Sequence, residues 1–184
     1  MKRITLFICL IALLSSTKAF SQKEKSIGGI FTTDYTEENS IRIGGGFIYE
    51  QRISSRLGIE SGLYYRNIET NIPSSSFYNT NSTTIIEHYI SFPLLLKYYS
   101  PIVNLSAGLN LDGFFGWHER YQQENVYISS YKVNPPYYLG FTFKISKILP
   151  LTDKLFLEPE IHFSPAISKN RNYLGMGFSV KYKL

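Results

Sequence analysis

A histidine and a serine stand two residues apart in the segment His162-Phe163-Ser164. Residues two apart in a strand project from the same face, as a general base and its nucleophile must. Glu160 shares that face and is within reach of the imidazole. The following segment, around Met176, offers no second acid to orient the imidazole. These residues therefore favour an interior histidine in a charge network over a catalytic site.

The segment 103–119 indicates which elements carry these residues. Every second residue from Val103 to Trp117 is apolar or glycine, and most of the residues between them are polar or small. A period of two predicts a strand with one apolar and one polar face. The same alternation predicts eight strands, at residues 26–35, 40–53, 57–67, 88–99, 103–119, 137–145, 154–164 and 171–184.

The connections between these strands alternate in length. Residues 54–56, 100–101 and 149–153 form tight connections, whereas residues 71–83 and 120–134 are long and polar. Short turns at one rim and long loops at the other are typical of transmembrane β-barrels. The predicted strands are also close to the length of about 9–11 residues that a tilted transmembrane strand needs.

The glycines and the charges of both signs share the polar face of the strands. Eight strands leave an interior only just wide enough for side chains, where glycines fit and opposite charges must pair. We therefore predict an all-β, eight-stranded antiparallel up-and-down transmembrane β-barrel with its apolar face toward lipid. Trp117 is expected near a strand end in the lipid-facing aromatic girdle. The predicted interior charge network is Arg42, Glu50, Arg52, Glu60, Arg66, Lys97, Asp112, Lys144, Glu158, Glu160, His162 and Lys181.

The first 21 residues predict a secretory signal peptide. Lys2 and Arg3 precede an apolar run at residues 4–14, and small residues precede a cleavage site after Ser21. The barrel domain is then residues 22–184. Cleavage removes three of the basic residues, which lowers the formal charge from +5 to +2, and removes the single cysteine, Cys9. We expect no nucleic-acid partner, disulfide, metal or cofactor.

Three strand segments resemble a known family. LGIESGLYYR (residues 57–66), ISFPLLLKYYS (residues 90–100) and the closing GMGFSVKYKL are similar to the small outer-membrane β-barrels of Bacteroidetes that are often labelled PorT-like. The resemblance implies an eight-stranded barrel in a Gram-negative outer membrane, with no known catalysis. It also implies contact with outer-membrane lipid and lipopolysaccharide, and assembly by the barrel-insertion machinery.

Several functions are compatible with this pattern. The favoured one is a non-enzymatic outer-membrane protein with a structural or binding role. Its long loops are either a binding surface for an envelope protein partner, a glycan or lipopolysaccharide, or solvated connections. The His162-Phe163-Ser164 segment resembles the His-x-Ser of outer-membrane lipid A deacylases, so a lipid A-modifying hydrolase is one alternative. Pro165 stands where those enzymes have asparagine. A small pore and a soluble lipocalin-like ligand-binding barrel are the other two alternatives.

Overall fold

Strands make up most of the chain that the structure describes. The computed structural model describes residues 24–36, 41–73, 82–120, 132–167 and 171–184. The strands are β1 (Lys25–Thr36), β2 (Ile41–Arg52), β3 (Leu57–Pro73), β4 (Ser82–Tyr98), β5 (Asn104–Glu119), β6 (Tyr137–Ser146), β7 (Leu149–Pro150), β8 (Leu155–Ala166) and β9 (Arg171–Lys183). None of the described residues forms a helix that is long and apolar enough to cross a membrane.

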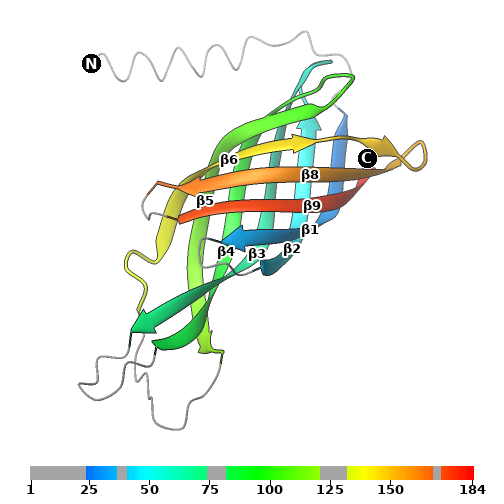
Figure 1. Ribbon diagram of the computed structural model, residues 1–184. Helices are drawn as coiled ribbons and strands as arrows, with labels where there is room; N and C mark the ends of the chain where they lie inside the picture. Colours follow the sequence, from blue (N-terminus) through cyan, green and yellow to red (C-terminus); the bar gives the residue numbers. More distant parts are fainter. Residues whose placement is uncertain (1–23, 37–40, 74–81, 121–131, 168–170) are drawn as a thin grey trace, which may run out of the picture.

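Eight long strands close into one antiparallel barrel (Figure 1). The strands β1 to β6 pair in sequence order, β9 pairs with both β1 and β8, and the pairing of β6 with β8 completes the ring. Closure gives each of the eight long strands a hydrogen-bonded neighbour on both sides, as a barrel wall in lipid requires. The predicted eight-stranded antiparallel barrel is confirmed. The two-residue β7 lies within the predicted tight connection 149–153 and pairs with β8.

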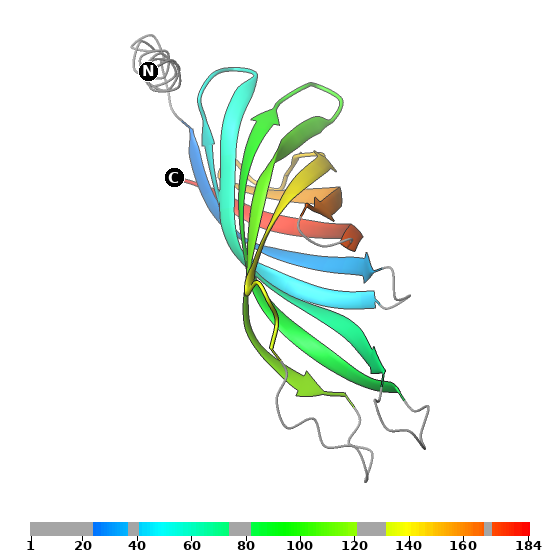
Figure 2. The ribbon, with the colours of Figure 1, turned by 90° about the vertical axis from the view of Figure 1, so that its left-hand side faces the viewer.

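The two ends of the barrel differ. At the turn end, short connections at residues 53–56 and 99–103 join strands, and β1 begins and β9 ends there. At the opposite end, which we call the loop end, β3 and β5 end and β4 and β6 begin. Figure 2 shows β3, β4 and β5 reaching beyond the other strands at the loop end.

β3 and β4 are longer than predicted. The alternation predicted strands at residues 57–67 and 88–99, but the pairing continues from Ile68↔Glu87 to Pro73↔Ser82. The added segment of β4 contains Thr84, Ile85 and Ile86, whose β-branched side chains favour the extended backbone. The predicted loop at residues 71–83 is therefore shorter than expected, and its remaining residues lie outside the described part of the chain.

The alternation of burial shows which face is inside. Along β6, exposed and buried residues alternate without a break. The exposed side chains are apolar, as with Phe47, which is 72% exposed, and Leu94, which is 53% exposed. Lys97 and Lys181 are fully buried inside the barrel. The apolar face therefore points outward, and the polar face lines the interior, as the sequence predicted.

A β-bulge in β5 changes one expected orientation. His88 of β4 lies opposite Gly116, but the next residue, Tyr89, lies opposite Phe114, so Phe115 has no partner on β4. One extra residue inverts the alternation beyond it. Trp117 is consequently opposite Glu87, which is fully buried, and directly opposed residues share a face. The prediction of a lipid-facing Trp117 is wrong, because a bulge has no signature in a simple alternation count.

Some of the glycines are required by close strand approach as well as by the narrow interior. A Cβ at Gly108 would overlap the backbone carbonyl of Leu94 on the adjacent strand, and a Cβ at Gly46 would overlap that of Leu63. A Cβ at Gly175 would instead meet the side chains of an interior ion pair. The glycines therefore serve two roles: they leave room for side chains inside the barrel, and they allow neighbouring strands to approach closely. The sequence indicated only the first role.

Candidate functional site

Seven ionised side chains meet at the centre of the barrel, in a group that we call the central ion cluster. They come from six strands and all point into the interior. Its members are Glu50 of β2, Glu60 of β3, Lys97 of β4, Lys144 of β6, Glu158 and Glu160 of β8, and Lys181 of β9. All seven belong to the predicted charge network, and the closed ring brings residues from distant parts of the sequence together.

Each lysine of the cluster contacts more than one carboxylate. Lys181 Nζ lies 2.6 Å from a carboxylate oxygen of Glu50, 2.6 Å from one of Glu158 and 3.4 Å from one of Glu60. Lys97 Nζ lies 2.8 Å from Glu50 and 3.5 Å from Glu60, and also pairs with Glu158. Such multiple pairing is what compensates the desolvation of charges buried in a barrel.

The remaining lysine extends the cluster toward the loop end. Lys144 Nζ pairs with Glu60 and lies 3.0 Å from Glu160. Neutral hydroxyls complete the cluster, since Tyr99 donates a 2.5 Å hydrogen bond to Glu50 and Ser146 donates one of 2.5 Å to Glu158.

Three carboxylates of the cluster are close enough to one another to suggest a cation site. Oxygens of Glu50, Glu60 and Glu158 lie within 4.8 Å of one another. Lys97 and Lys181 each contact all three of these carboxylates. The charges of these three carboxylates are therefore already neutralised by lysine ammonium groups. The geometry fits buried ion pairing rather than metal binding.

His162 lies in a second interior group, next to the central ion cluster. Its Nε2 is 2.5 Å from a carboxylate oxygen of Asp34 on β1, and its Nδ1 is 3.5 Å from Glu160. Arg66 Nε approaches Asp34 at 3.6 Å. The Ser164 hydroxyl forms its hydrogen bond with Thr142, at 2.9 Å.

This arrangement does not suit hydrolysis of a lipid. Both ring nitrogens of His162 face carboxylates, so neither presents a lone pair to Ser164. His162 and Ser164 are each only 3% exposed and point into the barrel, away from the apolar outer face. The structure thus places an acid, Asp34, beside His162, but it keeps the Ser164 hydroxyl out of reach of a membrane lipid.

The other predicted network residues lie outside these two groups. Asp112 accepts hydrogen bonds from Ser91 and from Asn110, the latter at 2.7 Å. Arg42 pairs with Glu69, which also contacts Arg120 at 2.6 Å, so these three residues form a separate group.

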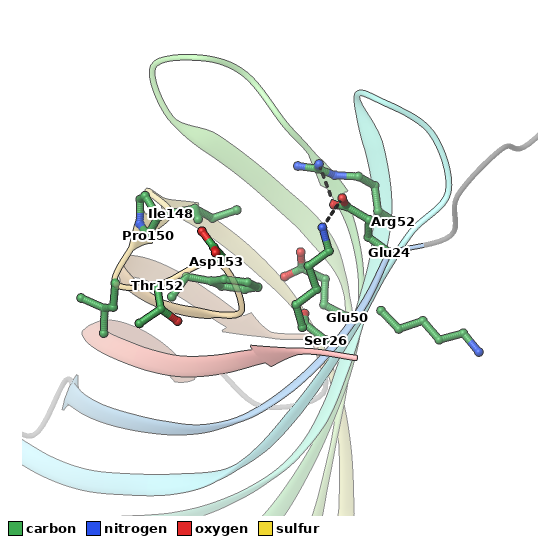
Figure 3. Close-up of a pocket in the computed structure, with 12 residues that line it drawn as sticks. Glu24, Ser26, Glu50, Arg52, Ile148, Pro150, Thr152 and Asp153 are labelled. Carbon is green, nitrogen blue, oxygen red and sulfur yellow. Dashed lines mark hydrogen bonds and ion pairs between the residues drawn. The ribbon is translucent and has the colours of Figure 1, made fainter.

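The turn end carries a pocket of about 490 Å³. Figure 3 shows Glu24 and Arg52 on one side of it, and Pro150 and Thr152 of the 147–154 connection on the other. Arg52 lies 3.1 Å and Lys183 lies 2.5 Å from Glu24. The hydrogen bond from Lys183 is the main cause that lowers the pKa of Glu24 below its usual value of 4.5. Arg52 therefore belongs to the mouth of the barrel and not to its centre.

Apolar side chains close the interior toward the loop end. Tyr89, Tyr138 and Tyr173 pack there with Ile68 and with Val133, which precedes β6 in the chain. The interior cavity beside His162 measures only about 10 Å³, close to the volume that a single water needs. The described side chains therefore fill the lumen between the turn-end pocket and the loop end.

Sequence reasoning missed several of these residues. Asp34 lies in the least regular predicted strand, and Glu24 lies just before that strand. Glu69 lies in the part of β3 that extends beyond the predicted strand 57–67. Asp34 could have been found from its strand face, because it alternates with Phe31 and Tyr35. No local pattern indicates that Val133 enters the interior cluster.

Comparison with known proteins agrees with this architecture. Residues 16–135 match a family model described as outer membrane protein beta-barrel domain. No curated protein matches the chain.

Solved structures of outer-membrane proteins have the same fold. A major outer membrane protein from Thermus thermophilus aligns with a TM-score of 0.60 and 10% identity, covering 89% of this chain and 100% of that one. OprG from Pseudomonas aeruginosa aligns with a TM-score of 0.57 and 13% identity, covering 88% and 96%. Neisserial surface protein A aligns with a TM-score of 0.51 and 11% identity, covering 89% and 98%. The family model and these folds locate the chain in the outer membrane.

Proposed function

The chain belongs to the outer membrane protein beta-barrel domain family, and from that premise we propose that it is a non-enzymatic barrel with a structural or binding role in the cell envelope. The observation that carries this proposal is the filled lumen. The central ion cluster and the apolar cluster at the loop end leave no described path for a solute. The surfaces that remain for function are the two ends and the outer face.

The burial of His162 and Ser164 supports the non-enzymatic role. A lipid A hydrolase needs its nucleophile at the lipid boundary, whereas Ser164 is buried inside the barrel and bonded to Thr142. The soluble lipocalin-like alternative conflicts with the outer-membrane location and with the apolar outer face.

The proposal includes a route to the membrane. Residues 1–21 act as a signal peptide that is cleaved after Ser21, and residues 22–184 then fold into the barrel. These first residues lie outside the described part of the chain. Barrels of this type have short periplasmic turns, so the turn end faces the periplasm and the loop end faces outward. The barrel-insertion machinery, lipid and lipopolysaccharide are its general partners, and its specific membership is the PorT-like group of Bacteroidetes.

Three measurements on the full-length protein test this function. Fractionation with a heat-modifiable shift in gel mobility is expected to give a folded barrel in the outer membrane. Planar bilayers containing it are expected to show no stepwise conductance. Lipid A mass spectra are expected to be the same with the wild type and with Ser164→Ala. Discrete channels would contradict the filled lumen, and a lipid A species that disappears with Ser164→Ala would contradict the non-enzymatic role.

A further inference from the structure

Two histidines meet on the outward face of the barrel toward the loop end. His88 of β4 and His118 of β5 stack with ring centroids 4.8 Å apart and an interplanar angle of 22°. His88 Nε2 lies 2.7 Å from His118 Nδ1, and His88 Nδ1 lies 2.7 Å from the hydroxyl of Tyr65 on β3. Phe115 packs beside them, with its ring centroid 5.8 Å from that of His88. We call His88 and His118 the histidine pair.

The β-bulge at Phe115 creates this pair. In an unbroken alternation from Val103, His118 would project into the barrel, on the opposite face from His88. The extra residue turns His118 outward, so that the two imidazoles lie side by side on neighbouring strands. His118 is exposed and His88 is half-buried, whereas the third histidine of the sequence, His162, is buried inside the barrel.

The environment of the pair orients its nitrogens for a ligand. When His88 Nδ1 carries the proton, it donates to the Tyr65 hydroxyl and leaves the Nε2 lone pair directed at His118. Histidine ligands of metals characteristically have such a hydrogen bond at the second ring nitrogen. When His118 carries its proton on Nε2, the lone pair of its Nδ1 faces the space between the two rings, as the Nε2 lone pair of His88 does. Both imidazoles are then neutral, and the move of the proton from one nitrogen of His118 to the other releases no proton.

The distance between the two nitrogens is close to what a shared ion requires. Tetrahedral zinc at about 2.0–2.1 Å from each nitrogen separates them by about 3.3 Å, so the rings need to part by about 0.6 Å. The exposed ring of His118 has the freedom to move that far. We infer that the histidine pair binds one divalent transition-metal cation of borderline softness, such as Zn²⁺ or Cu²⁺, with water completing its coordination.

The surroundings leave one side of the pair open to water. His118 is exposed, and the outward residues on either side of His88 along β4 are the apolar Ile86 and Ile90. Arg120, two residues beyond His118, contacts Glu69 at 2.6 Å, which partly neutralises its repulsion of a cation. Imidazole prefers Zn²⁺, Cu²⁺ and Ni²⁺ over Ca²⁺ and Mg²⁺, which prefer oxygen ligands.

Titration of the refolded barrel with metal tests this inference. The protein carries no affinity tag, is folded in detergent, and is titrated calorimetrically with Zn²⁺ and, in parallel, with Ca²⁺. The variants are His118→Ala, His88→Ala and Tyr65→Phe, with Tyr137→Phe as a control on the outward face of β6. Heat-modifiable gel mobility establishes that each variant is folded.

The wild type and Tyr137→Phe are expected to bind one Zn²⁺ per barrel and no Ca²⁺. Each histidine variant is expected to weaken Zn²⁺ binding at least tenfold, and Tyr65→Phe about tenfold through loss of the orienting hydrogen bond. The electron paramagnetic resonance spectrum of bound Cu²⁺ is expected to show two imidazole nitrogens. Absence of Zn²⁺ binding to the folded wild type, or equal binding by the folded histidine variants, would overturn the site. Neither outcome bears on the location or the closed lumen of the barrel.

Discussion

Lys181 is surrounded by carboxylates in the middle of the barrel. Its ammonium group lies within 3.4 Å of Glu50, Glu60 and Glu158. Replacing Lys181 by Met is expected to lower the free energy of unfolding by about 3–5 kcal/mol, because the three acids then remain buried with less compensation. Urea unfolding in lipid vesicles, followed by the fluorescence of the single tryptophan, measures the change.

Lys183 offers the matched control two residues further along β9. Its ammonium group pairs with Glu24 at the turn end, where its side chain is 41% exposed. Because surface ion pairs contribute only about 0–1 kcal/mol, Lys183→Met is expected to have a small effect. Equal losses for the two variants would show that burial inside the barrel does not determine the strength of these contacts.

Glu24 gives the barrel a pH dependence at its mouth. The hydrogen bond from Lys183 lowers the pKa of Glu24 in the folded state below 4.5, so the folded state takes up its proton less readily than the unfolded chain. The stabilisation that ionised Glu24 provides is complete above the pKa of Glu24 in the unfolded chain, and it is lost as the pH falls through the pKa of Glu24 in the folded barrel.

Comparison with Glu24→Gln isolates this contribution. The wild type is expected to be slightly more stable than Glu24→Gln at pH 7, and the difference is expected to shrink steadily as the pH is lowered below the unfolded pKa. Urea midpoints measured across this pH range provide the test. A difference that stays constant with pH would mean that the pair with Lys183 is not maintained in solution.

At the scale of the strands, close packing of neighbouring backbones makes one prediction. Gly108 on β5 has no room for a Cβ because the Leu94 carbonyl occupies its place, whereas Gly116 on the same strand has open space around it. Gly108→Ala is expected to impair folding, seen as loss of heat-modifiable mobility and a lower urea midpoint. Gly116→Ala is expected to leave both unchanged. The reverse order would contradict the close approach of β4 and β5 at Gly108.

The bulge in β5 makes a second prediction. Phe115 is the extra residue, so deleting it leaves Gly116 opposite His88, Trp117 inward and His118 outward in an unbroken ladder. The deletion is expected to leave a folded barrel that still binds Zn²⁺ and whose tryptophan emission stays close to that of the wild type. Calorimetry and emission spectra measure the two effects. Loss of Zn²⁺ binding together with a shift of the emission toward that of a lipid-exposed indole, in the folded deletion variant, would contradict the assignment of Phe115 as the bulged residue.

The strands show which features of the fold could be predicted from the sequence alone. Alternation predicted all eight long strands, because a barrel wall with lipid outside and ions inside imposes a period of two on every strand. It did not predict the bulge or the extensions of β3 and β4. Those features depend on the register between neighbouring strands, and the residue pattern of one strand does not determine that register. The register also brings His88 next to His118, which is 30 positions away in the sequence.

At the scale of the whole molecule, closure determines which charges meet. The sequence indicated the inward residues, but pairing of Lys181 with Glu50 requires β9 and β2 to share one lumen, which follows only from the closed ring. The same closure places Asp34 beside His162. The interior partners could therefore be predicted as a set but not as pairs, and the apolar seal that includes Val133 could not be predicted at all.

The central claim is that the apolar face meets lipid and the polar face lines a filled interior. Leu63 and Tyr64 are neighbours on β3 at the same depth, with Leu63 50% exposed on the outer face and Tyr64 7% exposed inside. In a Trp117→Phe background, we expect phospholipids with brominated acyl chains to quench the fluorescence of Leu63→Trp strongly and that of Tyr64→Trp weakly. Strong quenching of Tyr64→Trp with little quenching of Leu63→Trp would mean that the barrel is turned inside out.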